Sequence, residues 1–135
     1  MTISHLLDTS VFSQPIKNQP NVNVIERWSE LGDRVLCTGA ICLAEVLQGL
    51  EYRGSEKYWK RYKALLMNRY PVLMFDQQVA QTYAKLSAEL KRTGKPKPVM
   101  DLLIAAIAKQ HDLIIATLNV RDFAGIPGIR IEDWS

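Results

Sequence analysis

The chain has 135 residues, the size of one domain with its own hydrophobic core. Its hydrophobic fraction of 47% and charged fraction of 23% are ordinary for a soluble globular protein, and no segment approaches the ~20 apolar residues of a membrane span. The net charge of +3 permits an anionic partner without requiring one. We therefore expect a single domain over residues 1–135, with no membrane contact.

The few cysteine and histidine residues argue against a structural zinc site. Cys37 and Cys42 lie in apolar surroundings and are typical of small buried residues, while His5 and His111 are far apart in the sequence. The N-terminus has no basic region ahead of an apolar segment, so the sequence does not predict a signal peptide. These features together indicate a cytoplasmic protein.

The first elements alternate between strand and helix. A short apolar strand ends at Asp8, and Asn21 can cap a helix that runs to about Leu31, with apolar positions Val24, Ile25, Trp28 and Leu31. A second strand is expected over residues 34–38. A helix over residues 41–50 should follow, with Glu45 one turn inside it.

A basic and aromatic helix is expected over residues 56–69. Tyr58, Tyr62 and Leu65 are spaced so that they can pack on the core, and we favour this interpretation for the aromatic residues. The cations from Lys57 to Lys63 form either a solvated face or a surface that contacts phosphates, and the sequence leaves both open.

The second half continues the alternation. We expect a strand over residues 71–75, a helix capped by Asp76 that runs to about Arg92, a buried helix over residues 100–108, and strands over residues 113–116 and 129–131. Alternating strands and helices predict an α/β fold with a central parallel sheet of about five strands and helices on both faces. The most basic turn contains Lys91, Arg92, Lys95 and Lys97, which we take as candidate RNA contacts.

Acidic residues gather where the predicted strands end. Asp8 follows the first strand, Glu45 the second, and Asn119 and Asp122 the fourth, while Asp101 begins the helix before the fourth strand. Alone, Asp8 is more simply explained as a helix cap. Several carboxylates at one edge of the sheet would repel one another unless a cation joined them. Oxygen ligands favour Mg²⁺ or Mn²⁺, which promote phosphodiester hydrolysis.

A family resemblance rests on several motifs in a fixed order. They are Leu6-Leu7-Asp8-Thr9-Ser10, Ala44-Glu45-Val46 with Gly49, Asp101-Leu102-Leu103-Ile104-Ala105-Ala106, Thr117, and Asn119 with Asp122-Phe123. Each motif is weak alone, but together they resemble the PIN-domain ribonucleases, and within these the VapC toxins of prokaryotic toxin–antitoxin pairs. The resemblance extends over nearly the whole chain, to Ile126-Pro127-Gly128-Ile129 and Glu132-Asp133-Trp134.

The resemblance implies a three-layer α/β/α fold, a Mg²⁺-dependent endoribonuclease, inhibition by a cognate antitoxin and a homodimer. It implies that Asp8 and Asp101 are the principal metal ligands, that Glu45 is a ligand or polarises the attacking water, and that Asp122 completes the acidic set. Thr9, Thr117 and Asn119 would then orient the carboxylates or a water molecule. The RNA substrate, a tRNA or an mRNA, is not specified.

The sequence departs from the family pattern at two places. Gly39 and Ala40 stand where many relatives have a serine, and Leu118 replaces a common polar residue before Asn119. Other families with an aspartate at a sheet edge fit less well. A haloacid-dehalogenase-type phosphatase needs a second aspartate where this chain has Ser10, and an integrin-type metal site needs a serine where it has Phe12. A response-regulator receiver would need adjacent acids and a late lysine. The remaining alternative is a catalytically inactive RNA- or protein-binding module on the same fold.

Overall fold

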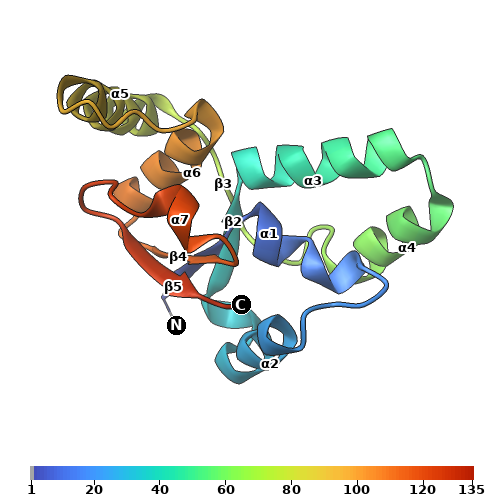
Figure 1. Ribbon diagram of the computed structural model, residues 1–135. Coiled ribbons are helices and arrows are strands. Elements are labelled where there is room, and N and C mark those ends of the chain that lie inside the picture. The colour runs from blue at the N-terminus through green and yellow to red at the C-terminus, as the bar shows by residue number, and fades with distance from the viewer. Residues whose placement is uncertain (1) are drawn as a thin grey trace.

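A computed structural model describes residues 2–135, which form one five-stranded sheet with helices on both faces (Figure 1). The strands are β1 (His5–Leu7), β2 (Leu36–Gly39), β3 (Val72–Leu73), β4 (Ile114–Thr117) and β5 (Arg130–Asp133). The longer helices are α2 (Val22–Leu31), α3 (Ala40–Arg53), α4 (Glu56–Leu65), α5 (Gln77–Arg92) and α6 (Val99–Gln110). The short elements are the helices α1 (Thr9–Phe12) and α7 (Val120–Phe123), and the 3₁₀ turns η1 (Gln14–Ile16) and η2 (Asp33–Val35).

The order of the strands creates a crevice beside the central strand. The order is β3-β2-β1-β4-β5, and all four neighbouring pairs are parallel. From β1 the chain proceeds to β2 on one side, and it later returns to β4 on the other. Ligands of open parallel sheets bind at such a reversal, beyond the carboxyl ends of the strands. Here that place lies between the ends of β1 and β4.

Hydrophobic residues cover both faces of the sheet. Leu6 packs in one cluster, mainly with residues of α5 and α6, whereas Leu7 packs in a second cluster with residues of α1, α2 and α4. Neighbouring residues of a strand point to opposite faces, so a strand buried on both sides reads as a continuous apolar run. The predicted three-layer α/β/α fold with about five parallel strands is therefore confirmed.

Several local predictions are also confirmed. The Asn21 side chain accepts a hydrogen bond from the Val24 amide at 3.1 Å and caps α2, and Asp76 caps α5 in the same way. Cys37 and Cys42 are buried, and burial raises the pKa of each thiol to about 12, so both side chains stay protonated.

The packing of the aromatic helix α4 is largely as predicted. Tyr58 and Tyr62 are buried in the second cluster. The prediction for Leu65 is wrong, because this side chain is 40% exposed and Leu66, the residue just after the helix, is buried instead. Of the nearby cations, Arg61 donates hydrogen bonds to the Ile16 carbonyl and to Asn18, so it holds η1 against α4.

Some predicted boundaries are wrong by a few residues. Helix α3 continues past Gly49 to Arg53, where Gly54 ends it at a φ of +64°, a conformation that glycine adopts without strain. Helix α4 is shorter than residues 56–69, β3 has only two residues, and β5 extends to Asp133. Ile25 was expected in the apolar stripe of α2, but it is 41% exposed. None of the helices within residues 2–135 combines the length and apolar character required to cross a lipid bilayer.

A partly buried network around Glu132 joins the edge strand β5 to the rest of the fold. The Glu132 carboxylate accepts hydrogen bonds from Arg27 Nε and Trp134 Nε1, both at 2.8 Å, and its other oxygen lies 3.2 Å from His5 Nε2. Burial alone would raise the pKa of Glu132, but the hydrogen bonds from Arg27, His5 and Trp134 outweigh burial and lower this pKa to about 2.

Replacing Glu132 with Gln should destabilise the protein by about 1 kcal/mol at neutral pH, because an amide oxygen replaces a carboxylate that accepts charged hydrogen bonds at a partly exposed site. The carboxylate's contribution is fully present above its unfolded-state pKa and is lost as the pH falls toward about 2. The difference between wild type and variant should therefore shrink in acid. Urea unfolding at neutral and acidic pH measures it, with Glu26→Gln on the exposed face of α2 as the control.

Candidate active site

Four carboxylates line one pocket at the carboxyl edge of the sheet, which we call the acid pocket. Asp8 follows β1, Glu45 lies in the second turn of α3, Asp101 in the first turn of α6, and Asp122 in α7. Thr9, Ser10, Ser13, Ile104 and Asn119 complete the lining. The structure thus brings together all four predicted acids from four separate segments.

Asp8 is the most deeply buried of these acids, with an exposed fraction of 5%. One carboxylate oxygen, Oδ1, accepts hydrogen bonds from Ser10 Oγ at 2.6 Å and from the Val11 amide at 3.0 Å, so Asp8 caps α1. The other oxygen, Oδ2, accepts one hydrogen bond, from Thr117 Oγ1 at 2.5 Å. A carboxylate oxygen has two acceptor positions, so Oδ2 retains one. Asp8 can therefore cap the helix and also serve as a ligand.

Two hydroxyl groups hold the Asp8 carboxylate in a defined orientation. Thr117 Oγ1 accepts a hydrogen bond from the Asn119 amide at 2.9 Å, and Ser10 Oγ accepts one from the Leu118 amide at 3.0 Å. Because each hydroxyl oxygen accepts a hydrogen bond from a backbone amide, the hydroxyl proton is free to be donated to the Asp8 carboxylate. The sequence indicated Thr117 for this role but identified Ser10 only as a turn residue. The two-residue spacing from Asp8 is the signal that could have found Ser10.

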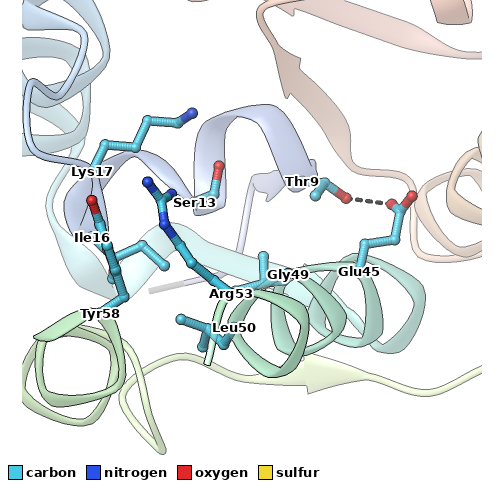
Figure 2. Close-up of a pocket in the computed structure, with 10 residues that line it drawn as sticks. Thr9, Ser13, Ile16, Lys17, Glu45, Gly49, Leu50, Arg53 and Tyr58 are labelled. Atoms are coloured by element: carbon cyan, nitrogen blue, oxygen red, sulfur yellow. Dashed lines mark hydrogen bonds between the residues drawn. The ribbon is translucent and has the colours of Figure 1, made fainter. Parts of the chain in front are cut away.

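Glu45 is held by Thr9 at the entrance of the acid pocket. Thr9 Oγ1 donates a hydrogen bond to Glu45 Oε1 at 2.5 Å, which Figure 2 shows as a dashed line. Many relatives have a serine where this chain has Gly39 and Ala40. Here the Thr9 hydroxyl orients the Glu45 carboxylate in its place. A side chain at Gly39 would be crowded, because its Cβ would lie only 3.2 Å from Ile107 Cδ1 of α6. The close packing of α6 on β2 thus explains the glycine.

Two of the carboxyl groups in the acid pocket have raised pKa values. Burial raises the pKa of Asp8 above its ordinary value, although the hydrogen bonds from Ser10, Thr117 and Val11 partly oppose this effect. Burial also raises the pKa of Asp101, and the charges of Asp122 and Glu45 raise it further. Without a cation, the carboxyl groups of Asp8 and Asp101 therefore hold protons more strongly than exposed aspartates do.

Only one of the four cations proposed for RNA binding acts on this pocket. The Lys97 ammonium lowers the pKa of Asp101 and donates a hydrogen bond to the Arg121 carbonyl at 3.1 Å. Lys91, Arg92 and Lys95 are exposed around the end of α5, and none of the four cations is among the residues that line the acid pocket. Asn119 lines the acid pocket, and its hydrogen bond to Thr117 comes from the backbone amide.

The donor set fits a hydrated divalent ion better than a fully enclosed one. Within residues 2–135, no three His, Cys, Asp or Glu side chains are placed so that they would hold a metal ion by themselves. Mg²⁺ usually keeps several water molecules and binds through one or two carboxylates and substrate phosphates. Asp8 and Asp101, lining one polar pocket, meet this requirement.

Comparison with known proteins identifies the family of this chain. Residues 5–128 match the PIN domain. Over 132 residues, covering 98% of both chains, the sequence is 35% identical to the tRNA(fMet)-specific endonuclease VapC of Salmonella typhimurium. It is also 35% identical to Toxin FitB of Neisseria gonorrhoeae, with coverage of 96% of this chain and 97% of that protein.

The structural comparison agrees with the sequence comparison. A chain in the crystal structure of DNA-bound VapBC from Salmonella typhimurium superimposes with a TM-score of 0.84 at 34% identity, covering 98% of this chain and 99% of that chain. The acid pocket therefore lies in a fold shared with these relatives over almost its whole length. The chain belongs to the PIN domain family and, within it, to the VapC group of ribonuclease toxins.

Proposed function

We propose that this protein is a Mg²⁺-dependent endoribonuclease, with Mn²⁺ as a working substitute. The observation that carries the proposal is the convergence of Asp8, Glu45, Asp101 and Asp122 in one pocket. The raised pKa values support it: burial raises both, and the neighbouring acids raise that of Asp101 further, so a cation would stabilise the ionised carboxylates.

Asp8 and Asp101 would hold the ion, and Asp122 would add negative charge beside them. A divalent ion in such a pocket stabilises charge on phosphate oxygens and activates water for attack. Glu45 Oε1 accepts a hydrogen bond from Thr9, so Oε2 is left to orient the attacking water and accept its proton. The water oxygen would then form a bond to phosphorus, the bond from phosphorus to one ribose oxygen would break, and that ribose oxygen would take up a proton from solvent water.

The substrate and partner follow from the relatives. We propose a tRNA as the substrate, because the Salmonella relative carries the name tRNA(fMet)-specific endonuclease. We also propose that a small antitoxin inhibits this chain, since solved relatives include VapBC and FitAB assemblies. The homodimer stays a prediction, which light scattering of the purified protein tests.

Replacing Asp8 with Asn should reduce the rate of RNA cleavage at least ~100-fold, which corresponds to about 2.7 kcal/mol of transition-state stabilisation. The variant should fold, because asparagine also caps helices. EDTA should stop cleavage by the wild type, and Mg²⁺ or Mn²⁺ should restore it. A gel assay of tRNA fragments measures both effects.

The matched control is Asp76→Asn, because Asp76 caps α5 through a similar hydrogen bond but does not line the acid pocket. It should cleave RNA at the wild-type rate. A folded Asp8→Asn protein with full activity would contradict the assignment and favour the inactive binding module.

Replacing Asp101 with Asn should separate a metal site from a set of helix caps. The raised pKa of Asp101 means that its ionised form destabilises the fold above that pKa. In EDTA at neutral pH, the variant should therefore melt at or above the wild-type temperature, and the difference should vanish once acid protonates Asp101.

Added Mg²⁺ should raise the melting temperature of the wild type and of Asp76→Asn by mass action, but that of Asp101→Asn much less. Thermal melts with and without Mg²⁺ measure this. An equal Mg²⁺ response in all three proteins would show that Asp101 does not hold the ion.

A further inference from the structure

A second pocket adjoins the acid pocket, and we call it the α3 pocket (Figure 2). The two share Thr9, Ser13 and Glu45, so they form one continuous surface. The rest of the α3 pocket is lined by Ile16, Lys17, Val46, Gly49, Leu50, Arg53 and Tyr58. It therefore combines an apolar floor with two cations and has one acid, Glu45, where it meets the acid pocket.

Helix α3 carries both ends of this surface. Glu45, Gly49 and Arg53 are spaced four residues apart, so they lie along one face of the helix. Eight residues of helix extend for about 12 Å, a distance that a few nucleotides span. Gly49 lies between the carboxylate and the guanidinium, and a Cβ there would meet no atom within 4 Å. The middle of the surface is therefore open.

Arg53 is held in place without a carboxylate partner. Its guanidinium lies 4.0 Å from the centre of the Tyr58 ring, and Tyr58 is itself buried and accepts a hydrogen bond from Asn18 at 2.8 Å. No carboxylate within residues 2–135 forms an ion pair with Arg53 or Lys17. In Figure 2 the head groups of Arg53 and Lys17 both lie on the Ser13 side, away from Glu45. Both charges are thus available to an anion.

Charge complementarity identifies the occupant. A phosphodiester chain that reaches the acid pocket meets repulsion from the carboxylates, and cations on both sides offset it by attracting the neighbouring phosphates. Lys97 lies on the α6 side of the acids, and Arg53 and Lys17 lie on the α3 side. A single RNA strand can contact all three cations while its scissile phosphate lies at the acids.

We propose that the α3 pocket binds the nucleotides on one side of the scissile phosphate in single-stranded RNA. Arg53 and Lys17 contact backbone phosphates, and Ile16, Val46 and Leu50 form the floor under a ribose or base. Tyr58 is a positioning residue, because it fixes the Arg53 guanidinium. This proposal rests on the proposed ribonuclease function.

Binding of a labelled single-stranded RNA of about twelve nucleotides tests the proposal, with Asp8→Asn as the background so that the RNA stays intact. Adding Arg53→Gln or Lys17→Gln should weaken binding about tenfold at low salt and reduce the slope of log affinity against log salt by about 0.7 each. The control is Arg34→Gln, an exposed cation ahead of β2 at the opposite edge of the sheet, which should change neither value.

Filling the pocket gives an independent test that does not change charge. Gly49→Leu places a side chain in open space on a helix, so the protein should melt at or above the wild-type temperature while its KM for RNA rises. Gly49→Ala, which adds only a methyl group, should be equally stable and bind RNA nearly as the wild type does.

RNA cleavage by the wild-type protein with Mg²⁺ is measured first, on tRNA and on mRNA. If neither is cut, the proposed ribonuclease function fails, whatever the variants of the α3 pocket do. If that protein cleaves RNA but Arg53→Gln, Lys17→Gln and Gly49→Leu all retain its affinity and salt slope, the proposal is overturned. It is also overturned if these variants bind RNA normally but no longer bind the cognate antitoxin, because the pocket would then be a protein-docking site.

Discussion

The position of Asp8 is the constraint on which the site depends. This carboxylate is buried at the reversal of strand order, where β1 ends beside β4, and Thr117 donates to it from the end of β4. A buried carboxylate without hydrogen bonds would cost several kcal/mol. The bonds from Ser10, Val11 and Thr117 offset that cost and join two strands and a helix around one group. The register of β1 on β4 therefore also sets the orientation of the site.

Acids occupy the centre of the functional edge, and cations lie on either side of it. Burial raises the pKa of Asp8 and of Asp101, and the neighbouring acids raise that of Asp101 further, as is common at functional sites. Lys97 lies on one side, and Lys17 and Arg53 on the other. The acidic centre attracts a cation, and the basic residues on either side attract an anion. This arrangement suits a metal ion and a phosphate chain bound in the same cleft.

Helix α3 connects the two cores with the functional surface. Cys42 packs in the first hydrophobic cluster, and Val46 and Leu50 pack in the second, while Glu45 lines the acid pocket. A helix with apolar residues on more than one face cannot rotate without exposing some of them. The direction of Glu45 is thereby fixed by packing, and Thr9 completes its orientation.

The sequence by itself determined the α/β class and the parallel sheet, because buried strands and amphipathic helices leave periodic patterns. It also singled out the four acids, Asp8 from its place after a strand and the others from motifs in a recognisable order. It placed Asp8 as both cap and ligand candidate, and the tertiary structure accommodates both, since the two oxygens have different partners. The role of Ser10, the exposure of Leu65 and the separation of Lys97 from Lys91, Arg92 and Lys95 were decided only by the fold. These depend on contacts between residues far apart in the chain, such as Ser10 with Leu118, and no local pattern encodes which distant group a side chain will meet.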